Sequence, residues 1–166
     1  MGNLNVAVLG PAGYAKDLGK KGTVSDITFY NLKKGDDTVT IIEPTRYPER
    51  LAPLFYAASM ADAVLIVVSA ITPTLGEWVL MLNEVGVEQG YIILQNYLTP
   101  DGVAPLLRGT VLEHYEFVEE DPIALRDRLL REAHARASVQ PGAGAVGTIP
   151  IDHHFNVRGI GTVILG

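Results

Sequence analysis

Three short segments of the chain are almost entirely apolar, and more mixed stretches separate them. The three segments are 5–9 (NVAVL), 63–68 (AVLIVV) and 91–94 (YIIL). Continuous runs of this length, rich in β-branched residues, are typical of parallel strands that are covered on both faces. The pattern therefore predicts a parallel sheet at the centre of the protein.

An antiparallel hairpin is predicted between the first two of these runs. Residues 25–32 (SDITFYNL) alternate between apolar and polar, residues 33–36 (KKGD) have the composition of a turn, and residues 38–42 (TVTII) form a second strand. The alternating segment 114–118 is expected to be the last strand. One antiparallel strand is thus expected in an otherwise parallel sheet.

Helical spacing of apolar residues predicts three longer helices, over about 47–58, 75–85 and 121–137. In the first, Pro53 is expected to bend or break the helix. In the second, Trp78 and Leu82 share one face and are interpreted as core residues. The third opens with Asp121 as its N-cap, followed by a proline. Residues 16–21, in contrast, predict little more than one helical turn.

This order of elements predicts an α/β domain over residues 1–137, with a mixed sheet and helices on both of its faces. Residues 138–148 (SVQPGAGAVGT) have the composition of a linker. Residues 149–166 predict a strand, a glycine turn and another strand. An isolated hairpin is marginal in water, so these residues are expected to dock on the domain or on another chain, and a homo-oligomer is one hypothesis.

Composition narrows the function classes. The chain has 166 residues, no cysteine and a net charge of −6, which excludes disulfides and argues against nucleic-acid binding over the whole surface. The clustered lysines Lys16, Lys20, Lys21, Lys33 and Lys34 leave local binding open. Without a signal peptide or a run of roughly 18 to 20 apolar residues, a cytoplasmic location away from membranes is expected.

No metal site or catalytic constellation is expected from the spacing of reactive residues. Asp152, His153 and His154 are adjacent, and adjacent strand residues point to opposite faces, so they cannot converge on one ion without a bulge. No Ser/His/Asp arrangement is supported by spacing either. We therefore assign no catalytic residue and no metal ligand from the sequence.

The loop after the first strand matches a phosphate-binding loop in part. In the pattern G-x-x-x-x-G-K-[ST], backbone N–H groups and the lysine hold phosphates and the hydroxyl holds Mg²⁺. Here the four positions carry Gly10, Ala15, Lys16 and Asp17, so only the first glycine and the lysine are present. Asp17 would place an anion beside the phosphate. The alternative interpretation is an ordinary Pro/Gly turn between a strand and a helix.

The order of motifs resembles the translational GTPases of the elongation factor Tu and SelB type, most closely the SelB-like factors of methanogenic archaea. The segment 151–163 (IDHHFNVRGIGTV) is similar to the opening of their second, β-barrel domain, and the segment 18–31 is similar to the archaeal paralogues. The resemblance covers nearly the whole chain. It implies a P-loop GTPase-like (Ras-like) mixed sheet followed by the first hairpin of a β-barrel.

Carried over by position, the resemblance also shows departures from a working GTPase. The position of the family's switch threonine is occupied by Val24. Thr23 and Ser25 flank it, so an alignment shifted by one residue is an alternative. The D-x-x-G motif falls on 43–46, with Glu43 at its start and Arg46 in place of its glycine.

The motif that reads guanine, [NT]-K-x-D, falls on 95–98 (QNYL). It keeps Asn96 but has Leu98 in place of the carboxylate. The last guanine loop falls on the acidic run 119–121.

Two functions are compared on this basis. The first is a SelB-like or elongation factor Tu-like G domain that is a pseudo-GTPase and binds a partner protein or the translation machinery. The alternative retains GTP or GDP with Mg²⁺ in a rearranged site, with Lys16 on phosphate, Arg46 as a second cation and Asp101 reaching the base. Selective tRNA binding is not expected of this chain alone, because the few lysines would give a weak, salt-dependent site.

Overall fold

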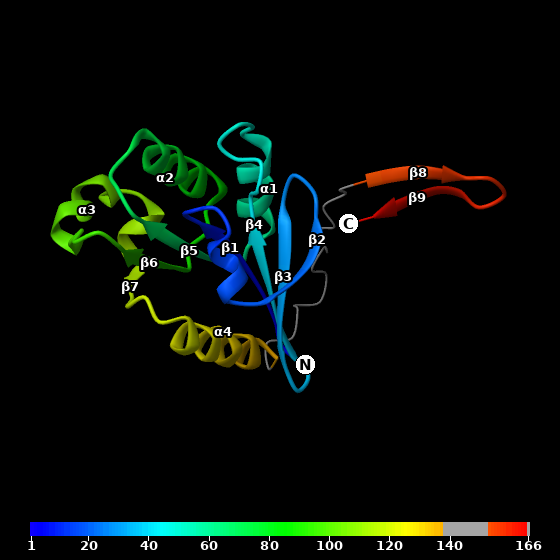
Figure 1. Ribbon diagram of the computed structural model, residues 1–166, viewed down its shortest axis with the longest axis horizontal. Helices are drawn as coiled ribbons and strands as arrows, with labels where there is room; N and C mark the ends of the chain where they lie inside the picture. The colour runs from blue at the N-terminus through cyan, green and yellow to red at the C-terminus, as the bar shows by residue number, and fades with distance from the viewer. Residues whose placement is uncertain (138–152, 166) are drawn as a thin grey trace.

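The computed structural model describes residues 1–137 and 153–165, and its centre is a seven-stranded sheet with the order β2-β3-β4-β1-β5-β6-β7 (Figure 1). The strands are β1 (Asn3–Leu9), β2 (Lys20–Val24), β3 (Thr28–Lys34), β4 (Asp37–Glu43), β5 (Ala63–Val68), β6 (Gly90–Leu94) and β7 (Glu116–Phe117). β3 pairs antiparallel with both β2 and β4, whereas β4, β1, β5, β6 and β7 are parallel. The expectation of one antiparallel strand is confirmed.

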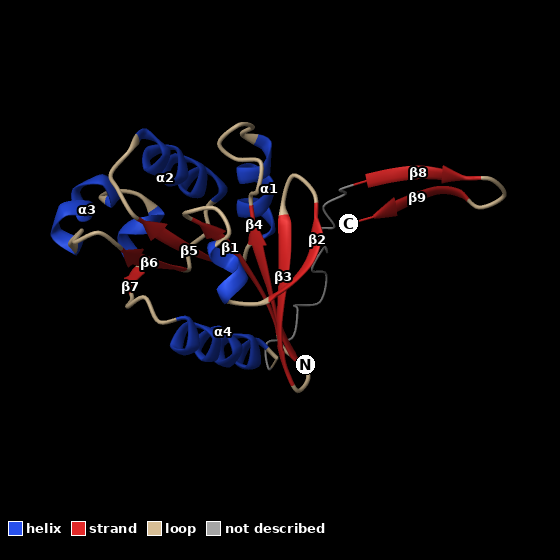
Figure 2. Cartoon of the chain, viewed as in Figure 1, coloured by secondary structure: helices blue, strands red, loops and turns tan. Residues whose placement is uncertain are grey.

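Helices cover both faces of this sheet (Figure 2). They are α1 (Ala52–Met60), α2 (Pro73–Val85), α3 (Pro100–Leu107) and α4 (Pro122–Arg136), with short 3-10 helices η1 (Tyr14–Asp17) and η2 (Val111–His114). Buried residues of α1, α2 and α3 pack in one cluster on one face, and those of α4 pack with η1 on the other. Because strands β1 and β5 contribute to both clusters, their continuous apolar sequence is explained.

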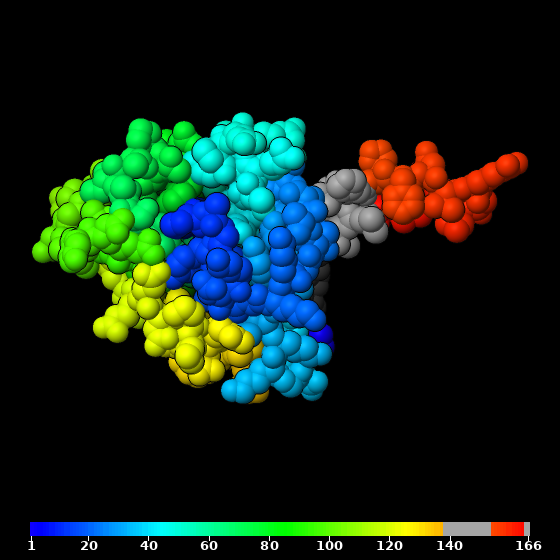
Figure 3. Space-filling model, viewed as in Figure 1, coloured from blue at the N-terminus to red at the C-terminus, as the bar shows by residue number. Residues whose placement is uncertain are grey.

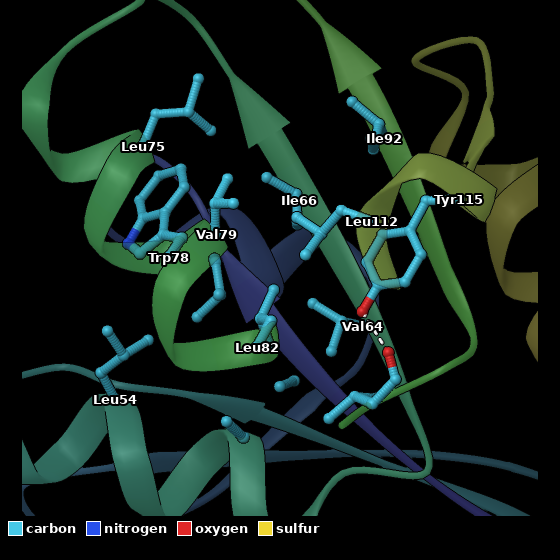
Figure 4. Packing of buried hydrophobic residues seen from close by; sticks show 14 of the residues in the cluster. Leu54, Val64, Ile66, Leu75, Trp78, Val79, Leu82, Ile92, Leu112 and Tyr115 are labelled. Atoms are coloured by element: carbon cyan, nitrogen blue, oxygen red, sulfur yellow. Dashed lines mark hydrogen bonds between the residues drawn. The ribbon is translucent and has the colours of Figure 1, made fainter. Parts of the chain in front are cut away.

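The cluster under α2 contains Trp78, the one tryptophan of the sequence. Trp78 and Leu82 lie in it, as their spacing predicts, and Leu82 is fully buried between α2 and the sheet near Val64 (Figure 4). Tyr115 closes the far end of the cluster, and its hydroxyl donates a hydrogen bond to the Val87 carbonyl at 2.6 Å.

The predicted helical turn over residues 16–21 is wrong in its second half. Helix η1 ends at Asp17, and the chain then enters the edge strand β2, which pairs with β3. Gly19 allows this close approach, since a Cβ there would lie 3.1 Å from the Asn31 carbonyl oxygen. Pairing with a strand already fixed by the hairpin therefore overrides the weak local helix signal.

Other boundaries differ by a few residues. Helix α1 begins at Ala52, so Pro53 lies in the first turn, where a missing N–H costs nothing, and does not break the helix. The last strand is reduced to β7, because His114 belongs to η2. The N-cap is confirmed: the Asp121 carboxylate accepts hydrogen bonds from the backbone N–H groups of Ile123 and Ala124.

A second sheet consists of β8 (His153–Val157) and β9 (Gly161–Leu165), which pair antiparallel as expected for the C-terminal hairpin. The predicted linker 138–148 lies outside the described residues. Within the part of the chain that is described, no helix is long and apolar enough to cross a membrane.

Candidate nucleotide site

Apart from Thr23, the residues of the candidate site lie at or beyond the carboxyl ends of three strands of the sheet, β4, β1 and β6. In open α/β sheets this edge is where ligands bind, at the point where the connections change direction. The loop at Gly10 follows β1, Glu43 ends β4, and Asn96 follows β6 shortly after its end. The fold thus brings together segments that are far apart in the sequence, as the P-loop interpretation requires.

The loop after β1 packs closely against the sheet, but no α-helix begins at its end. A Cβ at Gly10 would lie 2.8 Å from the Cβ of Val67, so this position needs glycine. Gly13 has a φ of 79°, in the left-handed region. A working P-loop continues into a helix, where the first N–H groups face the phosphate. Here only the four residues of η1 follow, with Ala15 fully buried.

The side chain of Glu43 accepts a hydrogen bond from a backbone N–H group of this loop. Its Oε1 accepts a hydrogen bond from the Gly13 N–H at 2.7 Å, and its Oε2 accepts one from the Tyr30 hydroxyl at 3.1 Å. The residue is only 8 % exposed. The carboxylate thus stands where a bound anion would accept from the loop. Sequence spacing gave no signal for this contact, because Gly13 and Glu43 are thirty residues apart.

Two threonines missed by the sequence reasoning lie beside Glu43. The hydroxyl groups of Thr28 and Thr45 are within hydrogen-bond distance of each other, and the Thr45 hydroxyl also donates to the Glu43 carbonyl at 3.3 Å. Thr28 is almost fully buried. Thr28 begins β3 opposite Glu43, and Thr45 follows the end of β4, so only the pairing of β3 with β4 could reveal that they are neighbours.

The remaining phosphate-side candidates are exposed. Lys16 and Asp17 are exposed at the end of η1. Thr23 is exposed on the edge strand β2, which β3 and β4 separate from β1. The Arg46 guanidinium is also exposed, and it lies 3.8 Å from the Glu49 carboxylate.

The segment at the base-reading position makes contacts within the protein. The Asn96 side-chain amide donates to the Ser69 carbonyl at 3.0 Å, and the Gln95 amide donates to the Glu120 carboxylate at 2.6 Å. Leu98 packs against the core. Tyr97 has a φ of 62° and a fully exposed side chain. A tyrosine in this backbone region is strained, which is more common at functional sites than elsewhere.

Two tyrosines next to the site have raised pKa values. Burial, followed by the nearby Glu120 carboxylate, raises the pKa of Tyr14 to about 12. Burial, followed by the Glu43 carboxylate, raises the pKa of Tyr30 to about 12. Both causes favour the neutral phenol, which keeps the Tyr30 hydroxyl available as a donor to Glu43.

Alkaline pH should therefore destabilise the fold. A group whose pKa is higher in the folded than in the unfolded protein contributes stability that is fully present below its unfolded value, near 10 for tyrosine, and is lost as the pH rises toward its folded value. We expect the free energy of unfolding to fall between about pH 10 and pH 12. Urea unfolding at a series of pH values measures it, and Tyr30→Phe should reduce the slope. A flat profile would contradict the assignment.

The sheet order, the crossovers and the loop after β1 define a P-loop GTPase-like α/β fold. Two solved structures share it. Translation elongation factor SelB of Methanococcus maripaludis, in complex with the GTP analogue GPPNHP, has a TM-score of 0.63 and 18% identity over 99% of this chain and 41% of that one. The bacterial selenocysteine-specific factor EF-Sec has a TM-score of 0.60 and 16% identity over 99% and 34%. Identity this low establishes the fold alone, which agrees with the SelB resemblance.

Among curated proteins, an uncharacterized protein of Methanocaldococcus jannaschii is 39% identical over 167 residues, which is 100% of this chain and 53% of that protein. The chain spans about half the length of this curated relative. No protein-family model matches the sequence.

Proposed function

We propose that this protein is a translation-factor-like G domain that has lost GTP hydrolysis and specific GTP binding, and that it acts by binding a protein partner of the translation machinery. The observation that carries the proposal is the Glu43 carboxylate on the Gly13 N–H. A phosphate that used this donor would have to displace Glu43 or lie beside its negative charge. Either event would weaken phosphate binding relative to a working P-loop.

The chain's residues do not fit GTP and Mg²⁺ at the other family positions. Asp17 stands in place of the hydroxyl that would hold the metal, and it is exposed at the end of a single 3-10 turn. Leu98 is packed on the core and offers no carboxylate to the base. Each lost charge-assisted hydrogen bond typically costs about 1.5–3 kcal/mol, and every 1.4 kcal/mol is tenfold in affinity. Even if these losses add only in part, the affinity for GTP would be too low for binding at physiological concentrations.

Isothermal titration tests this proposal. Mg-GTP, Mg-GDP and Mg-ATP are each titrated into the folded chain at about 0.15 M salt. We expect no saturable heat for any of them and no preference for guanine. A dissociation constant of about 10 μM or tighter with a clear preference for guanine would instead support the alternative, a GTP-binding domain with a rearranged site.

The partner-binding half of the proposal is supported by the exposed surface at this edge. Tyr97 is fully exposed on a strained backbone, and Ile71, which follows β5, is 51% exposed. Aromatic side chains that are exposed and held rigidly are favoured as contact residues. Cross-linking from a photoreactive residue at position 97 in a reconstituted translation extract should label a ribosomal or factor protein in preference to tRNA. Labelling of tRNA alone would contradict it.

We also propose that the β8–β9 hairpin opens a second, β-barrel domain after the G-like domain of residues 1–137. Phe155, Ile160 and Ile164 on this hairpin are 47%, 77% and 58% exposed. Apolar side chains on a two-stranded sheet need further strands or another chain to cover them. The segment resembles the start of a β-barrel, which supports the first possibility, that further strands cover these side chains.

A further inference from the structure

A groove lies between strand β3 and helix α4, on the face of the sheet opposite to α1 and α2. It encloses about 300 Å³, which is the lower end of the range for ligand pockets. Figure 3 shows the two elements meeting, with α4 in yellow and the β3–β4 hairpin in light blue. Leu32 and Leu130 are buried beneath the groove, and Ile123 stands at one end with 74% of its surface exposed.

The polar lining of this groove is mainly cationic. Lys34 has the same strand parity as Leu32, so both are on the α4 face of β3. Arg126 stands opposite on α4, next to Asp127. Within residues 1–137 and 153–165, neither Lys34 nor Arg126 forms an ion pair, whereas Arg128 and Arg136 of the same helix each pair with carboxylates. The groove thus combines an apolar floor with free positive charge.

The charge and shape favour a peptide over a nucleic acid. Among the residues that the structure describes, no aromatic side chain lines the groove, so none of them would stack on bases there. Asp127 interrupts the positive lining, so the groove offers no continuous row of cations for the evenly spaced phosphates of a nucleic acid. An acidic peptide with an apolar side chain would satisfy both parts of the lining, because its carboxylates can reach the cations while the apolar group covers the leucines.

We propose that the groove between β3 and α4 binds a short acidic segment of a partner protein through Lys34 and Arg126, with an apolar side chain of that segment seated on Leu32 and Leu130. The groove is formed by residues other than those of the nucleotide edge, so this proposal does not depend on whether GTP binds. Its small lining predicts a weak, reversible contact with a dissociation constant of about 10–500 μM.

Two-dimensional ¹⁵N NMR titration of the chain tests the proposal with synthetic probes. An eight-residue peptide of alternating Glu and Leu is compared with one of alternating Lys and Leu, and with a single-stranded RNA octamer. We expect the acidic peptide alone to shift the amide signals of β3 and α4. The double variant Lys34→Glu with Arg126→Glu should weaken this binding at least tenfold, and raising the salt from about 0.05 to 0.5 M should weaken it as well.

A matched control carries the same change of charge elsewhere. In Lys20→Glu with Arg108→Glu, both residues are exposed and lie outside the groove, so acidic-peptide affinity should stay within about twofold. Equal loss in both double variants would mean that only net charge matters and would overturn the site. So would tighter binding of the RNA, or the absence of acidic-peptide shifts in β3 and α4. The spectra of the variants report directly whether they fold.

Discussion

Replacing Leu82 with alanine should lower the free energy of unfolding by about 3–5 kcal/mol. Leu82 is fully buried on the inner face of α2, where it packs with the sheet residues near Val64 (Figure 4). Truncation removes apolar surface from the core and leaves a cavity that rigid β-strands cannot fill. Since small domains are stable by only about 5–15 kcal/mol, the loss is a large fraction of the total. Urea unfolding followed by circular dichroism measures it.

Leu80 provides the matched control. It lies two residues earlier in the same helix but is 67% exposed. Leu80→Ala therefore removes the same side-chain atoms from a position where little apolar surface is buried. We expect a change within about 0.5 kcal/mol. If the two variants lose similar stability, then α2 does not pack on the sheet as described.

Replacing Glu43 with alanine should cost about 2–4 kcal/mol of stability. The substitution leaves the Tyr30 hydroxyl, which is buried, and the Gly13 N–H, which is half-buried, without their acceptor. A buried donor that loses its partner pays its full desolvation cost. Glu43→Gln should cost less, because the amide oxygen still accepts one of the two hydrogen bonds.

Two comparisons separate this effect from a general loss of charge. Glu49→Ala removes an exposed carboxylate from the same region and should change stability by less than about 0.5 kcal/mol. In a double-mutant cycle, Tyr30→Phe combined with Glu43→Ala should show a coupling of about 1 kcal/mol or more. Additive effects would contradict the direct contact between the two side chains.

Local patterns were sufficient for most of the architecture. The continuous apolar runs at β5 and β6 predict buried strands because burial on both faces requires apolar residues at every position. The hairpin of β3 and β4 follows from alternation and turn chemistry. The Asp121 N-cap follows from the preference of a short carboxylate for free N–H groups. Each of these signals is confined to a few consecutive residues.

Tertiary structure decided the contacts between residues that are distant in the chain. Lys20–Val24 becomes a strand because β3 is already positioned to pair with it. The positions of Arg46 and Thr23 relative to the loop depend on strand order, which the motifs alone do not encode.

The contact of Glu43 with Gly13 has the same origin. Its acceptor and donor meet only once β4 lies beside β1 in register. The sequence by itself therefore determined most of the elements and the α/β class, since these depend on local periodicity, whereas β2 depended on its pairing with β3. The chemistry at the nucleotide edge was decided by the packed sheet, because hydrogen bonding there depends on the three-dimensional proximity of side chains and loop amides.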